Sequence, residues 1–141
     1  MRLGETADPQ AAATSADPPL PNHRAVEDAA SGGSFFILEA TREVPRLVQS
    51  SRKTVGVRIP DHPVTFAIIG ELGRPVISTT AARHGQEPHV DPKELDIEFP
   101  GLGLVVDAGP GGTVPTTVVD LTGRQPRVVR AGAGDAAPFG A

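Results

Sequence analysis

The stretch KTVGVRIPDHP, residues 53–63, decides the fold, because it predicts a short strand that ends in a turn. Val55, Val57 and Ile59 share one parity, so as strand residues they point to one face and pack on a core. Arg58 has the other parity and faces away from that core. The Pro-Asp-His-Pro that follows blocks further central pairing and predicts a turn into a helix.

Arg58 is a charged residue in an otherwise apolar strand, and two interpretations are open. Gly56 on the same face has no side chain and leaves room for a ligand or another backbone. The planar fork of a guanidinium holds a carboxylate or phosphate through two hydrogen bonds. The alternative is a surface ion pair with a neighbouring carboxylate, which this segment alone favours.

Outward from this strand, strands alternate with helices and predict an α/β layer on a mixed sheet. The strands are expected at 34–40, 54–60, 75–82, 102–109, 116–122 and 127–132. Helices are expected at 41–51, with Thr41 as N-cap; at 62–73, with an apolar stripe and Gly73 after its end; and at 91–99, with Asp91 as N-cap before Pro92.

The amino-terminal segment has a different composition from the rest of the chain. Residues 1–33 follow neither a helical nor a strand period and contain two Asp-Pro pairs, a Pro-Pro and an Ala-rich run. We therefore expect residues 1–22 to be disordered. The 141 residues allow one domain, although 16 glycines and 15 prolines are a high share for a packed fold.

Several function classes are excluded or disfavoured by composition. The chain has no Cys, which excludes disulfides, thiolate metal sites and a cysteine nucleophile. It has no Trp or Tyr and only five Phe, so stacking of bases on aromatic rings is a poor hypothesis. No apolar run reaches the roughly 18 residues of a membrane helix, and no signal peptide begins the chain. We expect a cytoplasmic protein without a membrane partner.

Charge is segregated along the chain. The formal net charge of −4 argues against a simple nucleic-acid binder. Between residues 41 and 58, however, five basic residues stand against one acidic residue: Arg42, Arg46, Arg52, Lys53 and Arg58 against Glu43. A solvated face is the ordinary interpretation of such a cluster, and polyanion binding is the alternative.

Catalytic and metal motifs are weak. There is no G-x-S-x-G elbow, and the glycine loop at 107–117 lacks the Lys-Ser/Thr of a P-loop. His84, His89 and Asp91 do not have the spacing of a tight metal site, so we predict no protein-held metal and no catalytic nucleophile.

Polar side chains instead cluster at strand ends. Ser78 and Thr80 share a parity, Thr116 begins a strand and Arg130 ends one. Hydroxyls at strand ends often satisfy nearby backbone groups. Together with Arg58, however, these residues form a set at strand ends of an open sheet, which is where ligands tend to bind.

Four motifs, KTVGVRIPDHP, PVISTTA, PTTVVDLTG and RVVRAGAGDAAPF, occur in the order and spacing of the YrdC-like family of L-threonylcarbamoyladenylate synthases. The phrases SFFILEATREVPRLV and GAGDAAPF most resemble its YciO branch. The resemblance implies a twisted, open α/β sheet with flanking helices. It also implies the synthesis of threonylcarbamoyl-AMP and pyrophosphate from L-threonine, bicarbonate and ATP, with Mg²⁺, for tRNA modification, and an association with double-stranded RNA.

The resemblance also assigns site residues. It implies threonine contacts at Arg58, Ser78 and Thr116, and ATP contacts at Thr54, Thr80 and Arg130. On this interpretation Arg58 clamps the carboxylate of threonine. The reaction needs no protein nucleophile, because the carbamate of threonine attacks the α-phosphate once it is positioned.

Two departures from the family pattern affect this assignment. The family's Ser-Ala-Asn is replaced by residues 80–82, Thr-Ala-Ala, and nothing in residues 1–33 supplies the family's Lys-x-Arg segment. We therefore expect residues 23–141 to be the carboxyl-terminal portion of such a domain, residues 1–22 to be unrelated to it because of a truncated or misassigned reading frame, and the chain alone to be inactive. A noncatalytic nucleotide- or RNA-binding module and an inactive remnant are the alternatives.

Overall fold

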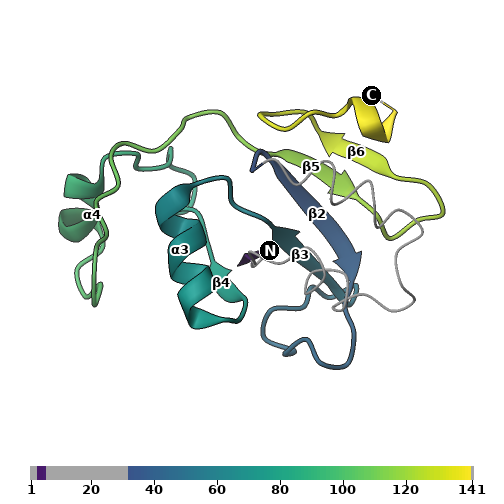
Figure 1. Cartoon of the computed structure of the whole chain (residues 1–141), viewed down its shortest axis with the longest axis horizontal. Coiled ribbons are helices and arrows are strands. Elements are labelled where there is room, and N and C mark those ends of the chain that lie inside the picture. Colours follow the sequence, from purple (N-terminus) through teal and green to yellow (C-terminus); the bar gives the residue numbers. More distant parts are fainter. Residues whose placement is uncertain (1–2, 6–31, 141) are drawn as a thin grey trace. The chain divides into compact units, whose positions relative to one another are not determined.

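The computed structural model describes residues 3–5 and 32–140 and shows an open, mixed six-stranded sheet in the order β4-β1-β3-β2-β5-β6 (Figure 1). The strands are β1 (Leu3–Glu5), β2 (Ser34–Glu39), β3 (Thr54–Arg58), β4 (Val76–Ser78), β5 (Thr117–Asp120) and β6 (Arg127–Arg130). The helices are α3 (Pro63–Leu72), α4 (Pro92–Glu98) and the 3-10 turn η1 (Ala137–Phe139). The predicted α/β class with an open mixed sheet is confirmed.

The sheet belongs to the larger of two compact units. Residues 1–78 and 115–141 form the larger unit, and residues 79–114, which contain α4, form the smaller one. Within the sheet, β1 runs parallel to β3 and β2 runs parallel to β5, whereas the other neighbouring pairs are antiparallel. No helix among the described residues is long and apolar enough to span a membrane.

One face of the sheet carries the main core. Phe36 pairs with Val57 on one side and with Val119 on the other. Apolar side chains of β2, β3 and β5 therefore point to the same face of the sheet. The ring of Phe139 in η1 packs edge-on against Phe36, with centroids 5.9 Å apart. Eight buried side chains make up this core: Phe36, Leu38, Val44, Val55, Val57, Val119, Leu121 and Phe139. The predicted core face of β3 is therefore correct.

The space beside Gly56 is filled from within the fold. A Cβ atom on Gly56 would lie 2.0 Å from Cζ of Phe35, so the Phe35 ring covers this glycine. The expectation that Gly56 leaves room for a ligand is therefore wrong. The glycine is needed because an aromatic side chain of the neighbouring strand lies flat on the sheet at this point.

Two helices begin and end at the residues that the sequence indicates. His62 is the extended N-cap residue before Pro63, and α3 ends at Gly73, which has φ 60°. Before α4, the Asp91 carboxylate accepts a hydrogen bond from the Lys93 backbone N–H at 2.9 Å. Pro in the first turn, a carboxylate N-cap and a left-handed glycine are sufficient local signals.

The predicted helix at 41–51 is wrong. The segment forms two consecutive turns, closed by Val44 N–H to Thr41 C=O at 3.3 Å and Val48 N–H to Pro45 C=O at 3.0 Å. The Thr41 hydroxyl accepts from the Glu43 N–H as in a local turn. Pro45 has no N–H to donate to the carbonyl four residues earlier, so a helix cannot continue through it.

Three further differences concern strands. No strand forms at 102–109, where Leu104 is 80% exposed and no neighbouring strand is present among the described residues. The strand expected at 75–82 shortens to β4, and its hydroxyl-rich end lies outside it. Residues 3–5 form β1 although residues 1–22 were expected to be disordered; residues 6–22 lie outside the described residues.

Candidate functional site

Strand register brings three of the predicted site residues to one face of the sheet. Gly56 in β3 pairs with Leu3 in β1, and Leu3 pairs in turn with Ser78 in β4. Paired residues of neighbouring strands point to the same side, as do alternate residues of one strand. Thr54, Arg58 and Ser78 therefore share the face opposite the main core.

The same face continues across the other half of the sheet. Phe35, whose ring covers Gly56, pairs with Val118 in β5, and Val118 pairs with Arg130 in β6. Thr116 precedes Val118 by two residues and has the same parity. Five of the six predicted site residues thus belong to this face, which we call the Arg58 face: Thr54, Arg58, Ser78, Thr116 and Arg130.

The two arginines of this face lie at the same end of the sheet, because β3 and β6 end where β2 and β5 begin. Arg58 donates from Nε and Nη2 to the carbonyl of Gly32 at 3.2 and 3.0 Å. The guanidinium is thereby anchored to the residue that leads into β2. Among the described residues, the partner of these two donors is a backbone carbonyl, and the ion pair with a surface carboxylate stays a prediction.

Arg130 makes the equivalent contact with the start of β5. Its Nε and Nη2 donate to the carbonyl of Thr116 at 3.1 and 2.8 Å, and Nη2 also lies 3.3 Å from the Thr116 hydroxyl. No carboxylate pairs with Arg130 in the described part of the chain. Arg130 and Thr116, expected separately at an ATP site and a threonine site, are in direct contact.

The loop after β6 is fastened beneath these residues by one buried hydroxyl. Thr117 donates through Oγ1 to the Gly134 carbonyl at 2.6 Å and accepts from the Gly132 N–H at 2.9 Å. Gly33 and Gly134 touch: a Cβ on Gly33 would lie 2.6 Å from the Gly134 nitrogen. This crossing of three segments fixes the backbone to which Arg130 is anchored.

Sequence reasoning overlooked this crossing. The alternation of the strand marks Thr116 as facing a ligand and Thr117 as facing the core, so it indicates no role for Thr117. The available signal was the glycine spacing, since Gly33, Gly132 and Gly134 all lie at strand ends where backbones approach closely.

Ser78 contributes a hydroxyl that lacks a partner. Its Oγ is buried and makes no hydrogen bond within the described residues. A buried unpaired hydroxyl costs about 1–3 kcal/mol, so such groups are uncommon in a finished core. A polar ligand on the Arg58 face is one means of satisfying it.

Thr54 does not lie at the arginine end of the sheet. Thr54 begins β3, four residues or roughly 13 Å from Arg58 along the strand. Its hydroxyl lies 2.7 Å from that of Ser50 and closes the turn before β3. Thr80 belongs to the smaller unit, where its carbonyl accepts from the Ala82 N–H at 2.9 Å. Their roles stay predictions.

The basic segment at 41–53 is exposed. Its basic side chains make no ion pair with any described residue: Arg42, Arg46, Arg52 and Lys53. Lys53 holds the left-handed conformation, with φ 57°, at the turn that leads into β3. The segment therefore presents positive charge that nearby carboxylates do not neutralise.

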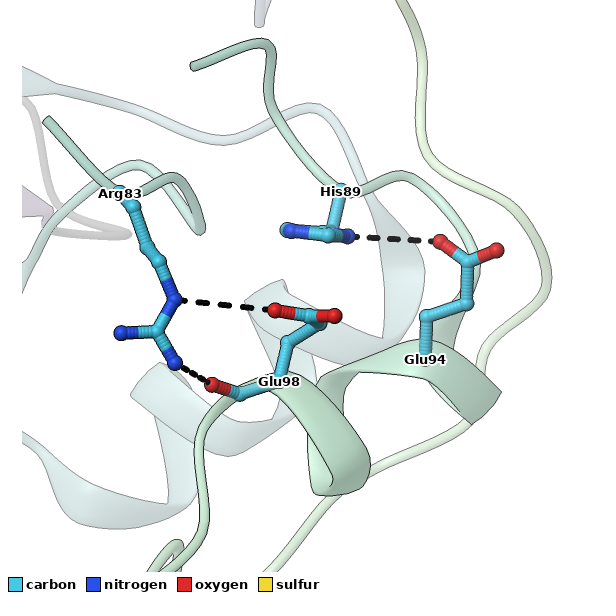
Figure 2. A network of polar contacts seen from close by, with 4 residues as sticks. All are labelled: Arg83, His89, Glu94 and Glu98. Carbon is cyan, nitrogen blue, oxygen red and sulfur yellow. Dashed lines mark hydrogen bonds and ion pairs between the residues drawn. The ribbon is translucent and has the colours of Figure 1, made fainter. Parts of the chain in front are cut away.

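Figure 2 shows the polar network of the smaller unit around α4. Arg83 bridges to the Glu98 side chain at 3.6 Å, and His89 Nδ1 lies 3.4 Å from Glu94 Oε2. Arg83 and His89 also contact the Phe99 ring, each 5.7 Å from its centroid. These contacts explain the positions of Arg83 and His89 structurally. No metal-binding group of three acidic or His side chains occurs within the described residues.

Comparisons with known proteins agree on one family. A family model described as "Telomere recombination", Sua5_yciO_yrdC, matches residues 6–132. E. coli K12 YciO is 42% identical over 119 residues, which cover 82% of this chain and 58% of that protein. The threonylcarbamoyl-AMP synthase of Yersinia enterocolitica is 37% identical over 97 residues, 67% of this chain and 50% of the relative. The match begins at residue 6, and the boundary expected at residue 22 stays a prediction.

Solved structures show the same fold. The crystal structure of E. coli YciO superposes with a TM-score of 0.88 at 35% identity, over 98% of this chain and 68% of that one. P. abyssi Sua5 in complex with L-threonine superposes with a TM-score of 0.83 at 24% identity, over 93% of this chain and 39% of that one. The chain thus spans a little over half the length of curated relatives such as E. coli YciO.

Proposed function

Since the chain belongs to the Sua5/YciO/YrdC family, we propose that its Arg58 face binds L-threonine and ATP and forms part of a threonylcarbamoyl-AMP synthase-like site. The observation that carries the proposal is the strand register. It gives a common face to residues from β3, β4, the start of β5 and the end of β6. Relatives named threonylcarbamoyl-AMP synthase and the threonine complex of P. abyssi Sua5 support the choice of ligands.

Threonine offers a carboxylate, an ammonium group and a hydroxyl. The guanidinium of Arg58, held in place by its hydrogen bonds to Gly32, brings positive charge to this face, which favours the carboxylate of threonine. The unpaired hydroxyl of Ser78 and the Thr116 hydroxyl are polar groups of the same face.

ATP enters as its Mg²⁺ complex, and Arg130 is the residue proposed to meet its phosphates. Arg130 Nη1 makes no hydrogen bond to the described residues, so its two N–H groups can donate to an oxyanion. In the reaction, the amine of threonine takes up bicarbonate carbon with loss of water, and the carbamate oxygen attacks the α-phosphorus. The bond to the β-phosphate oxygen breaks and pyrophosphate leaves, while cationic side chains stabilise the developing charge.

Binding, rather than turnover, is the activity proposed for this chain by itself. It covers 58% of E. coli YciO and 50% of the Yersinia synthase. We expect no pyrophosphate release with threonine, bicarbonate and MgATP. Sustained release would overturn the expectation of inactivity and would leave the binding proposal intact.

Thermal melting of the full chain tests the binding proposal. Ligands that bind the native state alone raise Tm, so MgATP and L-threonine together should raise it by several degrees. Arg58→Ala and Arg130→Ala should remove the rise, whereas Arg124→Ala, which alters an exposed arginine, should keep it. An equal rise in all variants, or none in the parent chain, would contradict the proposal.

A second function is favoured by the basic segment at 41–53, whose four exposed cations make no ion pair with the part of the chain that the structure describes. We propose that this segment can bind the phosphates of double-stranded RNA. Affinity should then fall linearly on a logarithmic salt scale, and Arg46→Ala should make that slope shallower by about one. A salt-independent affinity would exclude this mode of binding.

A further inference from the structure

Helix α3 carries more apolar surface than the described fold covers. The four largest apolar residues of α3 span about 160° at 100° per residue, in the order Ile68, Leu72, Ile69 and Phe66. Ile69, inside the stripe, is 2% exposed, but Phe66 is 49% exposed, Ile68 44% and Leu72 47%. A helix that packs normally on a domain buries its whole apolar stripe.

The exposed residues continue into the next strand. Only Gly73, Arg74 and Pro75 separate α3 from β4 (Figure 1). The side chain of Ile77 in β4 is 59% exposed. β4 is also an edge strand, because it pairs with β1 alone. Isolated apolar residues on a surface are ordinary, but four large ones on consecutive elements beside an open sheet edge indicate a contact surface.

The comparisons indicate what covers this surface. The superposition with E. coli YciO covers 98% of this chain but only 68% of that one, so about a third of the YciO chain has no counterpart here. Because this chain shares the fold of E. coli YciO with a TM-score of 0.88, we expect it also to share the faces on which the rest of that chain packs. An apolar helix flank and an open sheet edge are what the removal of packed secondary structure leaves behind.

We propose that Phe66, Ile68, Leu72 and Ile77, the α3 flank, are the docking surface for the remaining part of the family domain. The occupant is a polypeptide equivalent to the third of E. coli YciO that this chain does not match, whichever molecule carries it. The alternative occupant is a second copy of this chain. It is disfavoured because four residues of one helix and a short strand form a small patch, whereas stable homodimers bury large apolar interfaces.

Co-expression tests the proposal. The full chain, carrying a tag, is produced together with the unmatched segment of E. coli YciO. We expect the segment to co-purify in a 1:1 complex, and the double variant Phe66→Ser/Leu72→Ser to bind it at least about tenfold more weakly. Leu47→Ser is the matched control, because Leu47 is 68% exposed on a different segment and should bind like the parent chain.

The outcomes separate the alternatives. Because the altered side chains are half-exposed, the double variant should keep the melting transition of the parent chain, and circular dichroism checks this. The proposal is overturned if no complex forms with the parent chain, or if the double variant binds as tightly. It is also overturned if the chain alone sediments as a dimer that the double variant dissolves, because the occupant is then a second copy.

Discussion

At the residue scale, two glycines with different surroundings give a direct test of the packing of Phe35 on Gly56. Gly56→Ala would place a Cβ against the Phe35 ring, which must then move out of a packed position. We expect a loss of about 1–3 kcal/mol in the free energy of unfolding. Urea denaturation of the full chain measures it.

Gly70→Ala is the control for the same chemical change. Gly70 lies inside α3, and an added Cβ would have no atom within 4 Å outside the helix itself. Because alanine favours the helix, stability should rise by about 0.5–1 kcal/mol. A Gly56→Ala protein as stable as the parent would mean that the Phe35 ring does not lie on the sheet as described.

Thr117 gives a second prediction at this scale. Its buried hydroxyl is both donor and acceptor for the loop after β6, so Thr117→Val leaves Gly134 C=O and Gly132 N–H without their partner. We expect a loss of about 2 kcal/mol in the free energy of unfolding. Thr117→Ser keeps the hydroxyl and should lose clearly less. A loss in Thr117→Ser as large as that in Thr117→Val would contradict the role of the hydroxyl.

Single residues also mark the limit of reasoning from sequence. Parity alone correctly predicted that Arg58 points away from the core, since alternation is a local property of a strand. The partners of that side chain depend on which segments lie beside β3. Gly32 is 26 residues away in the chain, and no local pattern connects it with Arg58.

At the scale of elements, the β5–β6 hairpin contains an ion pair between Asp120 and Arg127 that depends on pH. Burial raises the pKa of the Asp120 carboxyl, but hydrogen bonds from Thr122 and the charge of Arg127 outweigh this, so its pKa lies below the ordinary value of 3.8. A carboxyl with a lowered folded-state pKa stabilises the fold above its unfolded-state pKa. The contribution is lost as the pH falls through the folded-state pKa.

The free energy of unfolding should therefore decrease as the pH falls below about 4, and Asp120→Asn should reduce that decrease. Urea denaturation between about pH 2.5 and about pH 6, roughly the range in which a carboxyl titrates, measures both. Asp96→Asn, at an exposed residue of α4, is the control. An unchanged pH profile in Asp120→Asn would contradict the role of this link.

Helices whose first and last residues carry strong sequence signals could be predicted. Strands could not be predicted as well, because a strand depends on a neighbouring strand. α3 and α4 have proline in the first turn, and the residues that end α3 and begin α4 are a left-handed glycine and a capping aspartate. The apolar run at 102–109 has strand-like composition, but a strand also needs a neighbour to receive its hydrogen bonds. Whether a neighbouring strand is available depends on the tertiary structure and not on the local sequence.

At the scale of the whole molecule, the Arg58 face joins residues from β3, β4, the start of β5 and the end of β6. The resemblance identified these residues, but only strand order and register show that five of them share one side. Two arginines anchored to backbone carbonyls at one end of the sheet favour binding of small anionic ligands.

Amide chemical-shift mapping of the 14.6 kDa chain on titration with MgATP and L-threonine tests this account most directly. We predict that the largest shifts fall at the arginine end: Gly32, Arg58, Ser78, Thr116 and Arg130. The amide resonances of residues whose side chains lie in the main core should shift little. Shifts confined to the basic segment at 41–53, or no shifts at saturating ligand, would contradict the assignment of the Arg58 face as the ligand site.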